Sequence, residues 1–186
     1  MKERVKEENA IVLDFLKNGY SEDSRPFHQR EPIVQAIGSK HFILLELVPQ
    51  KDIQLHQHDE VYIGDGVRKE ISYIKGTLKI EKLTQAAKTE LPHVIEKIID
   101  KNPDKFIEFF NKCGAISLRA HQLELLPGVG KRHAREIIEE RSIEPFISFE
   151  DIKTRVKSIS DPKKLIIQRI IDELNEKDRY KLFVRA

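Results

Sequence analysis

The sequence predicts an α+β protein in which a small β-barrel precedes a helical region. Three observations predict this class. Short apolar runs that end at glycine, proline or aspartate fill residues 1–83, and helix-start signals fill residues 84–179. Five short strands in succession favour a closed barrel over an open sheet, because closure hides the strand edges. We therefore expect a β-domain over 1–83, a helical domain over 84–179, and a C-terminal strand within 180–186 that returns to the barrel.

The composition is that of a globular protein with a heavily charged surface. The chain has 186 residues, of which 39% are hydrophobic and 34% are charged, and its formal net charge is +2. No run approaches the roughly 20 uninterrupted apolar residues of a membrane span, and the charged residues 1–8 lead us to expect no signal peptide. We therefore expect a cytoplasmic protein. The single cysteine, Cys113, excludes an internal disulfide.

The expected strands of the barrel are short and end at turn residues. They cover Ile11–Phe15, Ile33–Gly38, Phe42–Val48, Glu60–Ile63 and Ile71–Ile80. In the last strand, Tyr73, Lys75, Thr77 and Lys79 share one face and Ile74 lies on the other. An aromatic side chain among cations on a barrel strand is typical of proteins that stack the bases of single-stranded nucleic acid, although a solvated strand face has the same pattern. Tyr73, Lys75 and Lys79 are therefore candidate binding residues, and both interpretations stay open.

The expected helices begin at recognisable caps. Thr84 caps the first helix and Pro92 opens the second. Asn102 and Asp161 each precede a proline at the first helical position, and Ser148 resembles the start of a capping box. The expected helices cover Gln85–Glu90, Pro92–Lys101, Pro103–Lys112, Leu118–Leu126, Pro145–Val156 and Lys163–Asn175, with one more that begins after Gly130.

The most informative segment is the connection between two of these helices, LLPGVGKRHAREI at residues 125–137. Pro127 ends the first helix, and Gly128 and Gly130 let the backbone turn tightly and approach another molecule. The backbone N–H groups then lie at the positive end of the second helix, which favours a bound anion. Val129 is expected to point inward and to lock the two helices together.

Charge is sorted along the chain around this connection. Residues 111–135 hold five Lys and Arg and one Glu, a net charge of +4, whereas residues 136–150 hold five Glu and one Arg, a net charge of −4. Lys131, Arg132 and Arg135 directly follow the glycines and add full positive charges beside the amides. The connection therefore predicts a phosphate site, although a simple tight link between two helices is the alternative interpretation.

This segment resembles the helix-hairpin-helix, a motif that grips the phosphate backbone of nucleic acid without reading bases. The resemblance implies that the hairpin carbonyls can also hold a monovalent cation. Such motifs usually come in pairs, and the sequence offers an intact one over 118–139 and a degenerate one over 149–175. In the second, residues 159–163 lack both glycines and Pro162 removes an amide donor. We expect the second hairpin to be a structural partner and not a second phosphate clamp.

Three weaker alternatives concern metals and catalysis. His56 and His58 are alternate residues of an extended segment and could share a face, with Asp59 next in the chain, but no full set of ligands accompanies them, so no metal site is expected. Cys113 follows an apolar run, and packing explains it better than nucleophilic chemistry. The hairpin alone also resembles that of DNA glycosylases, and Asp151 lies where their catalytic aspartate would be, but the Gly-Pro loop before it is missing. We therefore expect no catalysis.

Six segments carry a resemblance over the whole chain. They are Arg30–Gly38, Phe42–Pro49, Val61–Gly64, Phe109–Asn111, His121–Lys131 and Ser148–Asp151. Through these segments the chain resembles DUF655, an archaeal family of unknown function. The resemblance implies an OB-like barrel followed by helix-hairpin-helix elements. It also implies gene neighbours that belong to ribosome and ribosomal-RNA modification systems, which favours RNA as the partner.

The sequence therefore predicts non-catalytic, non-sequence-specific binding of DNA or RNA, with no membrane partner. The hairpin residues expected to contact the nucleic-acid backbone are Gly128, Val129, Gly130, Lys131, Arg132 and Arg135. The alternative function is a protein-interaction module of the translation or ribosome-biogenesis machinery. Affinity for phosphates falls steeply with salt, whereas an apolar protein interface changes little, so a salt series separates the two functions.

Overall fold

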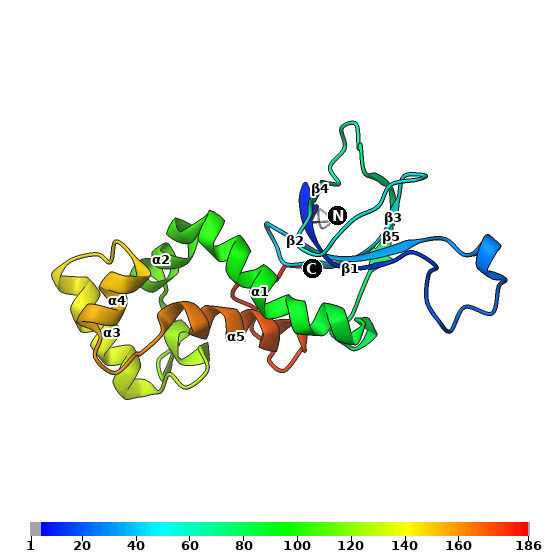
Figure 1. The fold of residues 1–186 in the computed structure, drawn as a ribbon. Coiled ribbons are helices and arrows are strands. Elements are labelled where there is room, and N and C mark those ends of the chain that lie inside the picture. Colours follow the sequence, from blue (N-terminus) through cyan, green and yellow to red (C-terminus); the bar gives the residue numbers. More distant parts are fainter. Residues whose placement is uncertain (1–4, 186) are drawn as a thin grey trace. The chain divides into compact units, whose positions relative to one another are not determined.

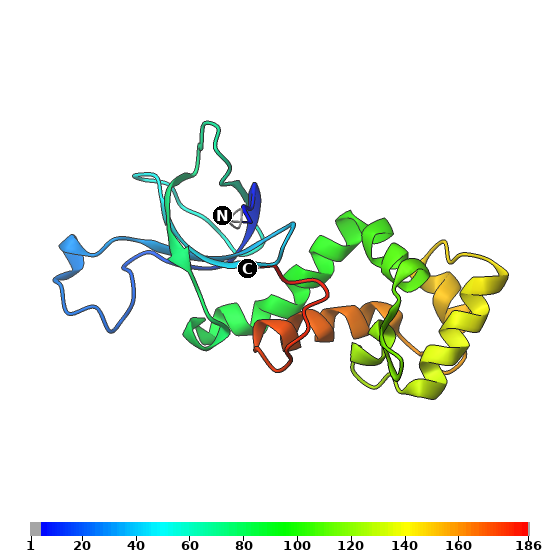
Figure 2. The ribbon, with the colours of Figure 1, turned by 180° about the vertical axis from the view of Figure 1, so that it is seen from behind.

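The computed structural model describes residues 5–185 and confirms the predicted α+β class (Figure 1, and Figure 2 from behind). The chain forms two compact units: one holds residues 5–94 together with 173–185, and the other holds residues 95–172. The first unit contains a five-stranded sheet, and the second contains most of the helices. Helix α1, Gln85–Lys101, runs through the boundary between them. No helix in the described residues is long and apolar enough to cross a membrane.

Five antiparallel strands form a curled half-barrel in the first unit (Figure 1). The strands are β1 (Asn9–Leu16), β2 (Ile33–Gly38), β3 (Leu44–Pro49), β4 (Glu60–Tyr62) and β5 (Ile71–Thr77). Their order in the sheet is β4-β1-β2-β3-β5. All five predicted strands are therefore confirmed.

The half-barrel is open between its two edge strands, β4 and β5. No ladder joins these strands in residues 5–185, so the predicted closure is incomplete. β4 pairs with β1 over three residues only, and two register shifts bend β5 where it runs along β3. As a result Ile74, which the sequence places on the inner face of the last strand, is 37% exposed.

Apolar side chains from the sheet and its loops form the core of the half-barrel. The buried members are Ala10, Val12, Val34, Ala36, Leu45, Leu47, Leu55, Val61, Ile63 and Ile71. Polar contacts fix the start of α1 to this sheet. Thr84 Oγ1 donates to Asp14 Oδ2 at 2.6 Å, and Gln35 Oε1 accepts the N–H of Thr84 at 2.9 Å. Thr84 also caps α1 as predicted, because its Oγ1 accepts the N–H of Ala87 at 3.0 Å.

Helix α1 corrects one expectation, because it is a single helix where the sequence predicts a break at Pro92. A proline inside a helix leaves the carbonyl four residues earlier without its donor and costs about 3 kcal/mol. Leu91, Ile95 and Ile98 are buried around it at helical spacing. Burial of each such side chain contributes about 1.5–3 kcal/mol, so packing outweighs the cost of the proline.

Four helices follow in the chain. They are α2 (Pro103–Lys112), α3 (Lys131–Ile143), α4 (Phe149–Arg155) and α5 (Pro162–Leu174). The predicted caps of the last two are confirmed: Ser148 Oγ accepts the N–H of Asp151 at 3.0 Å, and Asp161 Oδ1 accepts the N–H of Lys164 at 2.9 Å. The Asp151 carboxylate accepts the N–H of Ile147 at 3.1 Å instead of that of Ser148, so the cap is not the full capping box.

The expected helix over 118–126 is wrong. The segment contains β7 (Ala120–His121), which pairs with β6 (Ala115–Ser117) just before the segment, and the 3-10 helix η3 (Gln122–Leu125). Glu124 Oε1 accepts the N–H of His121 at 2.9 Å, and His121 Nδ1 accepts the N–H of Leu123 at 3.1 Å. These two side chains cap a helical turn at residue 121, so the residues before it pair as a short β-hairpin instead.

The C-terminal tail returns to the first unit, but the expected strand over 180–184 is absent from the described residues. The N–H of Arg185 donates to the carbonyl of His41 at 3.1 Å. The buried carboxylate of Glu173 accepts three N–H groups of the tail at 2.7, 3.0 and 2.9 Å, those of Leu182, Phe183 and Val184. These donors are already used, so they cannot form a strand ladder.

Candidate nucleic-acid interface

The glycine turn, residues 126–130, joins η3 to α3. The N–H of Val129 donates to the carbonyl of Leu126 at 3.1 Å, and Val129 is 6% exposed, so it packs inward as predicted. Gly128 has a φ of +77°, which strains any residue with a Cβ. A Cβ at Gly128 would meet no atom within 4 Å. The backbone conformation, and not packing, therefore requires glycine, and the outer side of the turn is open.

Several backbone donors at this turn have no acceptor in residues 5–185. They are the N–H groups of Gly128, Lys131 and Arg132. Gly130 is the N-cap of α3, and its own N–H donates to His133 Nδ1 at 3.1 Å. The first hydrogen bond of the helix runs from the N–H of Ala134 to the carbonyl of Gly130 at 3.0 Å. Gly130 thus offers no amide itself, and the first two residues of α3 offer theirs.

The three predicted cations project from the first turns of α3. Lys131, Arg132 and Arg135 are exposed, and none forms an ion pair with a carboxylate of residues 5–185. Lys131 and Arg135 are four residues apart and share a helix face. Glu136 is engaged elsewhere, because its carboxylate accepts the N–H of Ser158 at 3.4 Å. The hydrogen bond of the Ser158 side chain is the main cause that lowers the pKa of Glu136, and the backbone N–H of Ser158 and the charge of Arg132 contribute less.

Arg169 of α5 braces the glycine turn from the buried side. It is 4% exposed, and its Nη1 donates to the carbonyl of Leu125 at 2.9 Å. Sequence reasoning missed this residue, although an arginine inside the apolar run 165–171 is a signal. The carbonyls of Leu125 and Leu126 both accept protein donors. Each of these two carbonyls thus already accepts one protein donor, and the candidate site consists of the open N–H donors of the turn and the cations that follow them.

The second group of candidates belongs to the first unit, on β5 and just beyond its end. Tyr73 donates its hydroxyl proton to a carboxylate oxygen at 3.0 Å, and this hydrogen bond raises the pKa of Tyr73. The acceptor of Tyr73 is Glu31. The Nζ of Lys75 lies 3.3 Å from a carboxylate oxygen of Glu46, and the Nζ of Lys79 lies 3.4 Å from one of Glu176. Because every candidate is paired with an acid, the arrangement favours a solvated strand face over a stacking platform.

The residues behind the weaker alternatives have other roles. His58 Nε2 lies 2.7 Å from a carboxylate oxygen of Glu90, and no group of three His, Cys, Asp or Glu in residues 5–185 could hold a metal. Cys113 is buried at the end of α2, and burial raises the pKa of its thiol, which makes it a poor nucleophile. Asp151 forms an ion pair with Arg155 at 3.2 Å within α4.

Comparison with known proteins places this geometry in a family. A family model described as a protein of unknown function (DUF655) matches residues 6–185. The chain is 40% identical over 181 residues to the uncharacterized protein MJ0038 of Methanocaldococcus jannaschii, which covers 96% of this chain and 80% of that protein. The crystal structure of Af1531 from Archaeoglobus fulgidus is similar with a TM-score of 0.91 and 52% identity, over 96% of this chain and 100% of the other.

Proposed function

The chain belongs to the DUF655 family, and we propose that it binds the phosphate backbone of nucleic acid at the glycine turn, without catalysis. One observation carries the proposal: backbone donors without acceptors and cations that form no ion pair in residues 5–185 occur together at one open turn. The N–H groups of Gly128, Lys131 and Arg132 can donate to phosphate oxygens at the positive end of α3. The three cations that follow supply charge-assisted hydrogen bonds.

The proposed contacts fix position and read no sequence. Amides at a helix start and flexible cations bind phosphate oxygens, which are the same for every base. We therefore expect equal affinity for unrelated sequences of one length and one polymer. RNA is the polymer that the resemblance favours, and parallel titrations of RNA and DNA, single-stranded and duplex, identify the preferred form.

The double variant Lys131→Ala/Arg132→Ala tests the proposal. Both side chains are exposed, so the free energy of unfolding should change by no more than about 0.5 kcal/mol. If each side chain meets one phosphate, the slope of log affinity against log salt should flatten by about 1.4–1.8, the range from single strands to B-form duplex. Fluorescence anisotropy of labelled oligonucleotides over a salt series measures both affinity and slope.

The chain offers a matched control in the serine turn, residues 156–160, and the helix start after it. Lys157 and Lys164 are also exposed there, and Lys157→Ala/Lys164→Ala removes the same charge from the chain. This control should keep the parent slope. Equal behaviour of the two double variants would show that net charge alone attracts nucleic acid, and would remove the glycine turn as a site.

The alternative function, a protein-interaction module, is favoured by one observation. Three large apolar side chains of the second unit are exposed: Leu118 at 107%, Ile143 at 79% and Ile147 at 79%. Exposed apolar residues of this kind mark protein interfaces when they gather in one patch. A chain that binds no oligonucleotide at low salt, and whose binding to a partner is insensitive to salt, would support this alternative.

A further inference from the structure

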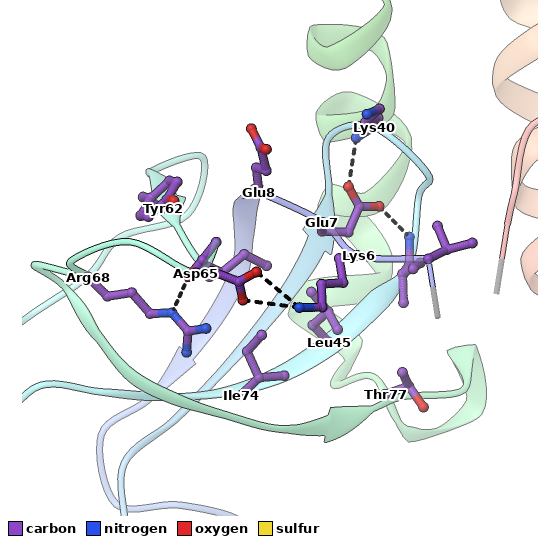
Figure 3. Close-up of a pocket in the computed structure, with 14 residues that line it drawn as sticks. Lys6, Glu7, Glu8, Lys40, Leu45, Tyr62, Asp65, Arg68, Ile74 and Thr77 are labelled. Carbon is purple, nitrogen blue, oxygen red and sulfur yellow. Dashed lines mark hydrogen bonds and ion pairs between the residues drawn. The ribbon is translucent and has the colours of Figure 1, made fainter. Parts of the chain in front are cut away.

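A pocket of about 520 Å³ opens in the first unit between the two edge strands of the half-barrel (Figure 3). Ile63 directly follows β4 and Ile74 lies on β5, so the pocket occupies the gap that the missing β4–β5 ladder leaves. Leu45 of β3 and Ile43 just before it complete an aliphatic floor. Ile74 is 37% exposed in this floor. An apolar ligand that covers the floor would remove this surface from water, which is favourable.

Arg68 gives this apolar pocket a fixed positive charge. Its Nε donates to the carbonyl of Gly64 at 2.9 Å, which holds the guanidinium in one orientation beside the floor (Figure 3). Neither Nη group has an acceptor in residues 5–185. The planar guanidinium therefore presents donors in the geometry that matches a carboxylate or phosphate.

The acids that line the pocket do not compete for Arg68. Glu7 is buried, and its carboxylate accepts three backbone N–H groups at 3.0, 2.8 and 3.3 Å, those of Lys40, His41 and Ile43. Asp65 forms an ion pair with Lys6 at 3.0 Å. Glu8 points away from Arg68 (Figure 3). Glu7 and Asp65 are thus engaged by other groups, and the Nη groups of Arg68 stay open to a ligand.

We propose that this pocket binds a small organic anion that combines an apolar body with one carboxylate or phosphate group. The body would lie on the four aliphatic side chains, and the anionic oxygens would accept from the Nη groups of Arg68. The volume is within the range of about 300–1,000 Å³ that holds small molecules in proteins. The site is independent of nucleic-acid binding, because all its residues lie in the first unit and the glycine turn lies in the second.

Isothermal titration calorimetry of the full chain with four probes tests this proposal. Octanoate and octyl phosphate share an apolar body and differ in the anionic group, octylamine carries the opposite charge, and acetate lacks the body. We expect both octyl anions to bind, and the one with the higher affinity identifies the anionic group that the pocket prefers. Octylamine and acetate should give no measurable heat. Octylamine binding as tightly as octanoate would reduce the pocket to an apolar patch and overturn the proposal, as would no binding by either anion.

Two variants and one control locate the binding. Arg68→Gln should weaken the octyl anions at least about tenfold, the size expected for a charged hydrogen bond. Ile74→Glu places a carboxylate on an exposed part of the floor and should abolish binding. The control Lys69→Ala removes an exposed charge next to Arg68 that does not line the pocket, and should bind like the parent. Unchanged binding by folded Arg68→Gln would overturn the proposal, and neither variant should alter oligonucleotide affinity.

Discussion

The glycine turn and the serine turn share one backbone hydrogen bond and one buried aliphatic residue, but their chemistry differs. In the serine turn the N–H of Ile159 donates to the carbonyl of Val156 at 3.1 Å, as that of Val129 does to Leu126. Ile159 is 5% exposed and Val129 is 6% exposed. Both turns therefore contain a buried aliphatic residue and one backbone hydrogen bond, and neither feature needs glycine. The positive φ of Gly128 does, and no residue of the serine turn has a positive φ.

The two turns differ in what happens to their donors. The N–H of Ser158 donates to the Glu136 carboxylate at 3.4 Å, Pro162 has no N–H, and the Asp161 side chain accepts the N–H of Lys164 at 2.9 Å. In the glycine turn and the helix start after it, the N–H groups of Gly128, Lys131 and Arg132 have no acceptor in residues 5–185, although that of Gly130 donates to His133 Nδ1. The comparison teaches that two helix starts with a similar buried residue differ as anion sites according to the side chain at the N-cap and the backbone donors that stay open.

Gly130→Asp should give the glycine turn the chemistry of the serine turn, with the largest effect of all. Gly130 has φ −94° and ψ −177°, which any residue adopts, and an added Cβ would lie 3.9 Å from His133 Nδ1. Because aspartate is a good N-cap, the variant should be as stable as the parent. A carboxylate beside the phosphate should weaken oligonucleotide binding by about 3 kcal/mol or more, measured by anisotropy at low salt.

Gly130→Asn is the control for this change, because it adds nearly the same shape without the charge. It should keep most of the parent affinity. Equal losses with Asp and Asn would show that the turn loses binding through shape and that the charge of the cap is irrelevant.

Arg169→Met tests the hydrogen bond by which Arg169 braces the glycine turn. The variant leaves the partly buried carbonyl of Leu125 without its charged donor, so the free energy of unfolding should fall by about 1–3 kcal/mol in urea denaturation. Arg135→Met is the matched control: that side chain is exposed, so stability should hold while affinity for oligonucleotides falls. A stable Arg169→Met chain would show that the carbonyl finds another donor.

Asp161→Ala should separate stability from binding in the serine turn. It removes the cap of α5 and should cost about 1 kcal/mol of unfolding free energy. Oligonucleotide affinity should not change, because the N–H of Ser158 keeps its acceptor, Glu136, and Pro162 has no N–H to offer. Weaker binding by Asp161→Ala at unchanged salt slope would place the serine turn in the interface after all.

Local signals in the sequence predict much of this structure. β2 runs over Ile33–Gly38 as the apolar pattern indicates, and the caps at Thr84 and Asp161 form as expected. The glycine turn is also local: Gly128 and Val129 adopt the expected conformation and burial within five residues of chain. Such features are readable because the interacting groups are close in sequence.

Features that depend on distant residues are not readable in this way. Leu118 fits the helical spacing of its neighbours, yet it is fully exposed in the connection between β6 and β7. Arg169 acts on Leu125 across 44 residues. On β5 the sequence shows the cation of Lys75 but not the partner acid, Glu46, because that acid comes from another strand. Partners of this kind decide whether a charged residue is part of a site or a neutralised surface.

Tyr73→Ala should have the smallest effect, and it extends the comparison to the half-barrel. A base stacked on Tyr73 would contribute about 1–3 kcal/mol, so the variant would lose that much affinity for single strands if the face were a platform. We expect no change, because the hydroxyl is engaged at 3.0 Å by Glu31 and the neighbouring lysines are paired. Tyr73→Phe keeps the ring and removes that hydrogen bond. A loss with Ala and none with Phe would establish stacking, and would make this strand face a second nucleic-acid contact in spite of its acids.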